Sequence, residues 1–158
     1  MEDPSTAAAA NPFVLWNASP LTNTNIANVL DASLARTGSR LEVLKVPGNL
    51  GESGARKTVT TCANVAQRIS AWVRIPVVLP NCYVYLQVGN VNISSRTMGV
   101  THTNWFEMSL TVTPSTPSVY VMVDIFCSTA GVYGPTAYVD DVSVSLVTAV
   151  PTAVQTVV

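Results

Sequence analysis

The stretch CYVYLQV, residues 82–88, alternates strictly between two kinds of side chain. Successive side chains of a β-strand point to opposite faces, so this stretch has two faces of different chemistry. One face is apolar and consists of Val84, Leu86 and Val88. The other combines aromatic and hydrogen-bonding groups and consists of Tyr83, Tyr85 and Gln87. The apolar face predicts a core strand, and the second face needs a separate explanation.

The same two-residue period recurs along most of the chain, with loops rich in Gly, Pro, Ser and Asn between the periodic segments. It predicts strands at residues 40–46, 56–61, 67–75, 82–88, 105–113, 118–127 and 137–147. The spacing in IANVLDASLAR (26–36) instead predicts a turn or two of helix. Many short strands separated by turns are typical of an all-β fold, either an antiparallel sandwich or a barrel.

Length and composition restrict the class of protein. The chain of 158 residues fits one domain with a substantial core. Charged residues make up only 11% and the net charge is −1, which argues against nucleic acid or a membrane surface as a partner. No apolar run approaches the ~20 residues of a membrane-spanning helix. We expect one domain over residues 11–147, after a disordered or cloning-derived segment (1–10) and before a tail or linker (148–158).

Several features favour a secreted glycoprotein. The chain is poor in Lys and rich in Ser and Thr, and it contains the glycosylation sequons Asn17-Ala-Ser and Asn92-Ile-Ser. Pro20 directly after the first sequon weakens it. Residues 1–10 lack the charged start and apolar stretch of a signal peptide, as in a mature chain behind a cloned start or in an intracellular protein. We predict secretion, with glycosylation at Asn92 and Asn17.

Two more strands have a mixed second face. In residues 67–75, Trp72 and Arg74 lie opposite the apolar row, and in residues 118–127 the same holds for Tyr120, Met122 and Asp124. If these strands share a sheet with residues 82–88, one surface collects Trp72, Arg74, Tyr83, Tyr85, Gln87, Tyr120, Met122 and Asp124. Rings beside hydrogen-bonding groups suit a sugar, whose C–H faces stack and whose hydroxyls bond. The alternative is that the rings pack beneath a loop or against a second chain.

Cys82 begins one predicted strand and Cys127 ends another, and both lie on the apolar side by parity. Antiparallel neighbours would bring these positions together, so we predict a disulfide between them. In the chain-entropy model its closure contributes about 4 kcal/mol. The alternative is a pair of buried thiols. With the disulfide formed, Cys62 remains unpaired and is expected in the interior.

The sequence offers little for catalysis. His102 is the only histidine, and no nucleophile or orienting acid stands near it. Glycoside hydrolysis needs two carboxylates about 5–10 Å apart. Asp124 stands alone on the proposed surface, and Asp140 and Asp141 are expected to point to opposite sides. No phosphate-binding loop, CxxC pair or HExxH motif occurs. We therefore predict that the protein is not an enzyme.

Several segments occur in a familiar order: NPF (11–13), TGSRLEVLKV (37–46), TVTTCANVAQRISAWVR (58–74), NWFEMSLTVTPSTPSVYV (104–121) and AYVDDVSVSL (137–146). With them the chain resembles CenC-type carbohydrate-binding modules, the family 4 and 9-like domains attached to plant-cell-wall hydrolases and found in fungal secreted proteins. The resemblance covers roughly residues 11–147. Its most specific piece is the Asp-Asp-Val ending after a Trp-led strand.

The resemblance implies a jelly-roll β-sandwich of two antiparallel sheets, similar to galactose-binding domains. It implies that a concave sheet binds glycans such as β-glucans, xylan or amorphous cellulose. Trp72 matches a strand position from which such modules present a stacking ring. The positions of Cys82 and Cys127 look like those of the fungal branch.

The resemblance also bears on a cofactor. In the family, a glutamate after the N-terminal Phe and an aspartate of the closing strand help to hold a structural calcium. Here Phe13 is followed by Val14, while Asp140 and Asp141 remain. The resemblance thus implies Asp140 as a calcium ligand. The alternative is no cofactor, with Asp140 and Asp141 solvated at a bulged strand end.

Two functions fit the sequence. The first is a noncatalytic, monomeric module that binds plant or fungal cell-wall polysaccharide. In it, Trp72, Tyr83, Tyr85 and Tyr120 stack on sugar rings, and the hydroxyls are bonded by Arg74, Gln87 and Asp124. The second is a structural or protein-interaction sandwich, of an adhesive or effector type, that uses the same surface for protein contact. A dimer that hides the rings fits this second function.

Overall fold

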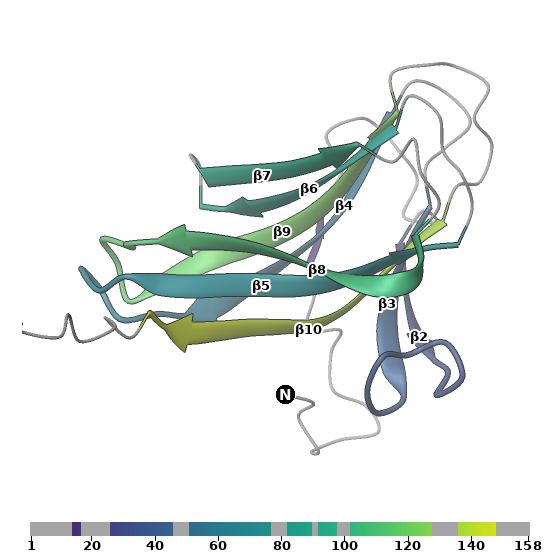
Figure 1. Ribbon diagram of the computed structural model, residues 1–158, viewed down its shortest axis with the longest axis horizontal. Coiled ribbons are helices and arrows are strands. Elements are labelled where there is room, and N and C mark those ends of the chain that lie inside the picture. Colours follow the sequence, from purple (N-terminus) through teal and green to yellow (C-terminus); the bar gives the residue numbers. More distant parts are fainter. Residues whose placement is uncertain are drawn as a thin grey trace, which may run out of the picture.

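In the computed structural model, the described residues are 14–16, 26–45, 51–76, 82–89, 92–97, 102–127 and 136–147. They form ten β-strands, β1 to β10. Within these ranges no helix is long and apolar enough to cross a membrane. The strands are arranged in two layers that face each other (Figure 1).

Each layer is a five-stranded antiparallel sheet. Sheet A contains, in spatial order, β1 (Val14–Trp16), β4 (Gly51–Thr60), β9 (Ser118–Cys127), β6 (Cys82–Val88) and β7 (Asn92–Thr97). Sheet B contains β2 (Ile26–Leu30), β3 (Arg40–Lys45), β10 (Thr136–Leu146), β5 (Gln67–Ile75) and β8 (His102–Val112). The predicted fold class, an all-β sandwich of two antiparallel sheets, is confirmed.

The hydrophobic core lies between the sheets and is built from the apolar rows that the alternation predicts. The inward residues of β6 are each 2% exposed or less: Cys82, Val84, Leu86 and Val88. The core also contains Val121, Val123 and Ile125 of the neighbouring strand β9. From the opposite sheet, β5 contributes Ile69, Ala71 and Val73. Burial of a Val, Leu or Ile side chain contributes roughly 1.5–3 kcal/mol. Because a slip by one residue would expose a whole row, the rows fix the inward side of each strand.

The prediction of helical turns over residues 26–36 is wrong for residues 26–30, which form β2 and pair with β3. A single turn follows, in which the Asp31 carbonyl accepts the N–H groups of Leu34 and Ala35 at 3.1 and 3.0 Å. The Asp31 carboxylate accepts hydrogen bonds from the hydroxyl and the N–H of Ser33, at 2.6 and 2.8 Å, and these bonds lower the pKa of Asp31. Pairing with a neighbouring strand overrides a weak helical spacing.

Two further strands were not predicted. β1 has only three residues, too few to show a period. β7 has the sequence NISSRT, in which polar residues dominate and no apolar row exists. Both are edge strands of sheet A. An edge strand can lack a fully apolar side, and in these two the alternation is too short or too polar to detect.

The predicted grouping of three strands in one sheet is wrong in part. β6 and β9 are neighbours in sheet A, but β5 lies in sheet B between β10 and β8. Trp72 and Arg74 therefore lie on the opposite layer from the tyrosines. Strand parity determines which side of a strand faces the core, whereas the choice of layer depends on topology, which parity does not encode.

The turn over residues 61–66 is organised by the buried side chain of Gln67. Its Oε1 accepts the N–H of Cys62 at 3.1 Å, and its Nε2 donates to the carbonyls of Cys62 and Val65 at 2.8 and 3.2 Å. Gln67 is 2% exposed. The hydrogen bonds from Gln67 involve the backbone of Cys62, whose side chain is exposed, so the expectation that Cys62 lies in the interior is wrong.

Cys82 and Cys127 lie directly opposite each other in the pairing of β6 with β9, which is the placement that the predicted disulfide requires. We expect the oxidised protein, unfolded in denaturant, to show one reactive thiol, that of Cys62, and three after reduction. Joint replacement Cys82→Ala and Cys127→Ala should lower the free energy of unfolding by about 4 kcal/mol in the chain-entropy model. Cys62→Ser is the control. Three reactive thiols without reduction would contradict the disulfide.

Candidate functional site

The outer side of sheet A carries the aromatic and amide side chains that alternate with the apolar row. The cross-strand pairs here are Tyr83–Phe126, Tyr85–Asp124 and Gln87–Met122. β4 extends the rows, with Arg56 opposite Met122 and Thr58 opposite Tyr120. The tyrosine face is the name used below for the surface of the partly exposed residues Tyr83, Tyr85, Gln87 and Tyr120. The structure thus brings these four predicted residues together on one surface.

Hydrogen bonds and ring contacts order the tyrosine face. Tyr83 and Tyr85 are stacked, with ring centroids 6.3 Å apart and planes inclined by 28°. The Nε2 of Gln87 donates to the carbonyl of Gly89 at 3.0 Å and to the hydroxyl of Tyr120 at 3.4 Å. The N–H of Gly89 donates to the Tyr120 carbonyl at 2.9 Å. These bonds hold Tyr120 against the turn that follows β6.

An open groove of about 460 Å³ borders Tyr120. Its described lining comes from β4, β9, the turn after β6 and the loop before β9, and consists of Arg56, Thr58, Gly89, Thr116, Ser118, Val119 and Tyr120. The guanidinium carbon of Arg56 lies 5.6 Å from the centre of the Tyr120 ring, within cation–π range. Gly89 has a φ of 60°, and a Cβ placed there would meet no atom of the described residues within 4 Å. No described side chain therefore fills the space beside this turn.

Asp124 lies on the same side of β9 but is only 1% exposed. Its carboxylate lies close to β4, because a Cβ placed on Gly54 would be 3.1 Å from the Asp124 Oδ1. A carboxylate buried to this extent is not presented to a ligand at the surface. The placement therefore does not support the predicted role of Asp124 in bonding sugar hydroxyls.

Trp72 and Arg74 lie on the outer side of sheet B, where side chains of this chain already contact them. The guanidinium carbon of Arg36 is 3.8 Å from the ring centroid of Trp72. Arg74 lies 4.8 Å from the ring centroid of Tyr138 and 5.6 Å from that of Trp105. The prediction that Trp72 and Arg74 line one surface with the tyrosines is wrong, because the two sheets turn their outer sides away from each other.

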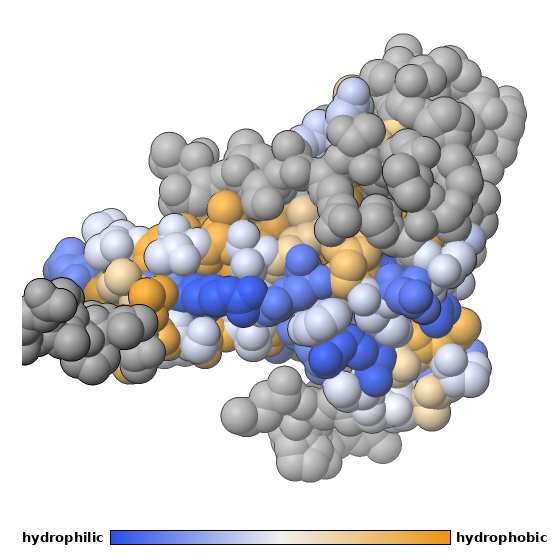
Figure 2. All heavy atoms as spheres, viewed as in Figure 1, coloured by the Kyte–Doolittle hydropathy of each residue, from blue (hydrophilic) through white to orange (hydrophobic). Residues whose placement is uncertain are grey.

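Hydrophilic residues form a band along β5 and β8, and hydrophobic residues lie between this band and sheet A (Figure 2). Between these two strands, Arg68 on β5 donates from Nη1 and Nη2 to the two carboxylate oxygens of Glu107 on β8, both at 2.7 Å. These hydrogen bonds hold the pKa of Glu107 below its usual value and raise the pKa of Arg68. Arg68 and Glu107 thus neutralise each other on this side of the molecule.

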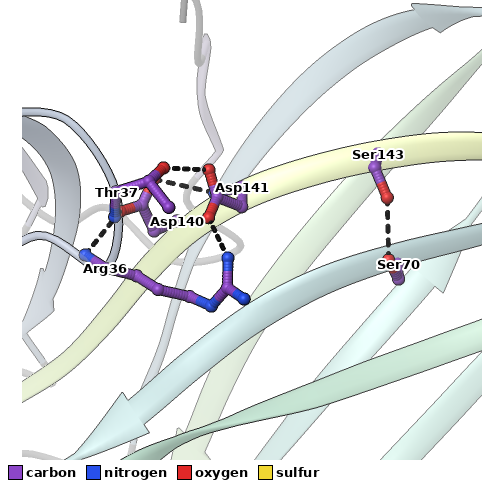
Figure 3. Close-up of polar contacts among 6 residues, drawn as sticks. All are labelled: Arg36, Thr37, Ser70, Asp140, Asp141 and Ser143. Carbon is purple, nitrogen blue, oxygen red and sulfur yellow. Dashed lines mark hydrogen bonds and ion pairs between the residues drawn. The ribbon is translucent and has the colours of Figure 1, made fainter. Parts of the chain in front are cut away.

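Asp140 and Asp141 anchor the loop between β2 and β3 (Figure 3). Asp140 is 8% exposed; its Oδ2 accepts the N–H groups of Arg36 and Thr37 at 2.8 and 3.3 Å, and its Oδ1 accepts the N–H of Asp141 at 2.7 Å. Burial raises the pKa of Asp140, and the hydrogen bond from Arg36 opposes that rise. Asp141 forms an ion pair with the guanidinium of Arg36 and accepts the Thr37 hydroxyl at 2.7 Å.

The expectation that Asp140 and Asp141 point to opposite sides is wrong. The pairing of β10 with β5 shifts between Asp140 and Ser143, and Asp141 has a φ of 47°. This β-bulge turns both carboxylates toward residues 36–37, and the ladder resumes where the hydroxyls of Ser143 and Ser70 are 2.9 Å apart. The alternative predicted a bulge with solvated carboxylates at a strand end. The bulge is present, but it lies within β10, and Asp140 is buried.

This donor set does not fit the structural calcium that the resemblance implies at Asp140. Calcium takes six to eight oxygen ligands. Here the Asp140 oxygens accept backbone N–H groups, and the guanidinium of Arg36 supplies positive charge at Asp141. In the part of the chain that the structure describes, no three His, Cys, Asp or Glu side chains group as metal ligands. We therefore assign calcium no role at this bulge.

The structure describes one of the two predicted glycosylation sites. Asn17 lies outside the described residues. Asn92 begins β7, the edge strand of sheet A, opposite Val88. Glycosylation at either site stays a prediction.

Three residues that shape these surfaces were missed by sequence analysis: Arg36, Arg56 and Gly89. Arg36 fell in the predicted helical turn. The predicted strand 56–61 begins at Arg56, whereas β4 begins at Gly51, so the prediction did not assign Arg56 to either side of the strand. A partial signal exists, because Gly54, Arg56 and Thr58 alternate with Ala55, Lys57 and Val59. Gly89 carried no signal beyond its glycine in a turn.

Comparison with known proteins identifies the fold. No protein-family model and no curated protein matches the chain. Among solved structures, the carbohydrate-binding module TmCBM61, in complex with β-1,4-galactotriose, matches with a TM-score of 0.62 at 13% identity, over 85% of this chain and 88% of that one.

Two other solved modules match over similar lengths. The CBM22-1 xylan-binding domain of Xyn10C from Paenibacillus barcinonensis has a TM-score of 0.53 at 14% identity, over 87% of this chain and 86% of that one. A CBM4 structure has a TM-score of 0.54 at 15% identity, over 87% and 90%. Likeness at these identities shows that the chain has the β-sandwich fold of carbohydrate-binding modules.

We expect Asp140→Ala to lower the stability of the domain, because three N–H donors lose a buried acceptor. The loss should be roughly 1–3 kcal/mol, which corresponds to a few degrees in Tm for a domain of this size. Glu107→Gln, which removes an exposed ion pair of the same sheet, is the matched control and should change Tm much less. Thermal unfolding followed by circular dichroism measures both. Equal shifts in the two variants would show that Asp140 does not anchor the loop.

We also expect the Tm to be insensitive to calcium. A bound ion at 100 times its Kd would stabilise the fold by about 2.7 kcal/mol, whereas Arg36 already neutralises Asp141. Thermal unfolding in excess calcium and in excess chelator should give the same Tm. A calcium-dependent rise that Asp140→Ala abolishes would place the ion at the bulge and contradict this expectation.

Proposed function

We propose that this protein is a noncatalytic carbohydrate-binding module that recognises polysaccharide on the tyrosine face. The observation that carries the proposal is the placement of Tyr83, Tyr85 and Tyr120 on one outer side of neighbouring strands, partly exposed. Rings of this kind accept the C–H faces of sugars, and the groups between them bond hydroxyls. The occurrence of the same fold in a module solved with β-1,4-galactotriose and in a xylan-binding domain supports the proposal.

Binding needs little rearrangement in this arrangement. The stacked pair of Tyr83 and Tyr85 offers a preformed platform along β6, and Gln87 holds the hydroxyl of Tyr120. Fixed rings lose little side-chain freedom when a ligand arrives, which preserves affinity. A sugar chain that crosses from β6 to β9 contacts the platform first and the groove at Tyr120 next. The expected affinity is modest, because a surface contact with a wet ligand desolvates little apolar area.

The ligand class, secretion and monomeric state in this proposal rest on the sequence. The segments shared with CenC-type modules favour plant or fungal cell-wall polysaccharide, such as β-glucan or xylan, as the ligand class. Low Lys content and the sequons favour secretion of a monomeric domain. Trp72 and Arg74 have no part in this binding surface, because they lie on sheet B.

The proposal predicts which rings matter. Tyr85→Ala and Tyr120→Ala should each weaken retention on a polysaccharide gel about fivefold, since one aromatic contact is worth on the order of 1 kcal/mol. Trp72→Ala is the matched control, because it removes a larger ring from the opposite sheet and should leave retention unchanged. Affinity electrophoresis against xylan, β-1,3-glucan, cellulose derivatives, chitin oligomers and β-1,4-galactan measures the effect, with circular dichroism to verify folding.

Other outcomes would redirect the proposal. If Trp72→Ala alone abolishes retention, sheet B is the binding surface. If no glycan binds and light scattering shows a dimer that Tyr85→Ala dissociates, the alternative of a protein-interaction sandwich is correct. The sheet B surface of Trp72, Trp105 and Tyr138 with their arginines is the other surface where such contact could be sought.

A further inference from the structure

The groove beside Tyr120 has an uneven distribution of charge. Among its described lining residues, Arg56 is the only charged one. Neither of the ion pairs found among the described residues includes Arg56. Asp124, two positions further along β9 than Met122, is 1% exposed and lies close to Gly54. The formal charge of the described lining is therefore positive, although the whole chain carries a net charge of −1.

The other lining groups complete a small polar site. Thr58, Thr116 and Ser118 are exposed and bring hydroxyl groups to the groove. The hydroxyl of Thr116 donates to the carbonyl of Ser118 at 2.7 Å, so its oxygen remains able to accept a hydrogen bond. The volume of about 460 Å³ lies within the ~300–1,000 Å³ typical of small-ligand sites. Gly89 has no described residue beside it, which leaves room there for the rest of a longer ligand.

The guanidinium of Arg56 and the ring of Tyr120 are arranged for a ligand that is both cyclic and anionic. A guanidinium presents paired N–H donors that match the two oxygens of a carboxylate. The Tyr120 ring, 5.6 Å from the guanidinium carbon, offers a stacking surface beside it. A neutral sugar would use the ring and the hydroxyls but would bring no opposite charge to Arg56, the one charged residue of the described lining.

We propose that the groove selects glycans that contain uronic acid, with Arg56 pairing the carboxylate and Tyr120 stacking on the sugar ring that bears it. This inference rests on the proposed function, because it names the ligand class of the same surface. It assigns two tasks to two regions of sheet A. The Tyr83–Tyr85 platform binds sugar rings irrespective of charge, and the groove at Arg56 supplies the preference for acidic units.

The test compares ligands whose carboxylates are either free or neutralised as methyl esters. Isothermal titration of the whole chain with α-1,4-galacturonic acid oligomers, and with the same oligomers fully methyl-esterified, should give about tenfold tighter binding of the acid form at low salt. The ratio should shrink between roughly 20 and 300 mM salt, because screening weakens an exposed ion pair. Arg56→Gln should remove the preference but retain binding of the ester, and Arg56→Lys should keep part of it. Arg68→Gln, on the opposite sheet, should change nothing.

The outcomes separate this inference from the proposed function. Equal affinity for acid and ester, or an acid preference that survives Arg56→Gln, overturns the uronate assignment and leaves glycan binding in place. Tighter binding of a sulfated galactan than of the galacturonan also overturns it, in favour of sulfate esters. Failure of every acidic and neutral glycan to bind overturns both proposals. Circular dichroism of each variant ensures that lost binding is not lost folding.

Discussion

The structure depends on the exclusion of water from the space between the two sheets. Each central strand gives one apolar side to that space, and the rows on β5, β6 and β9 are almost completely buried. Because side chains alternate, a strand whose apolar row packs in the core must turn its remaining side chains outward. Tyr83, Tyr85 and Gln87 face outward for this reason alone. The surface chemistry of this domain is therefore set by core packing as much as by any ligand.

Much of the fold could be predicted from the sequence, because alternation reports directly on burial. The predicted strands at 67–75, 82–88 and 118–127 coincide with β5, β6 and β9. The candidate site was predictable only strand by strand. Nothing in the residues around Trp72 indicates that β5 joins the other sheet, since pairing partners lie far away in sequence. Arg56 and Gly89 likewise acquire significance only when β4, β9 and the turn after β6 come together.

The two outer surfaces contain similar residue types in different arrangements. On the sheet B side, three arginines are engaged: Arg36 covers Trp72, Arg74 lies between Tyr138 and Trp105, and Arg68 binds Glu107. On sheet A, Tyr83 stacks on Tyr85 and Arg56 lies near the Tyr120 ring, and a groove remains beside Tyr120. Composition alone does not distinguish a surface that is saturated by its own side chains from one that can accept a ligand.

The bulge at Asp140 and Asp141 has a consequence for the surroundings in which the domain can remain folded. Its positive charge is covalently part of the chain, in the side chain of Arg36, and cannot be washed out or captured. Polymers rich in carboxylates bind divalent ions from solution. A domain whose closing strand needed such an ion would compete with such a polymer for it. With an arginine at that position, the bulge itself does not compete with an acidic matrix for a divalent ion.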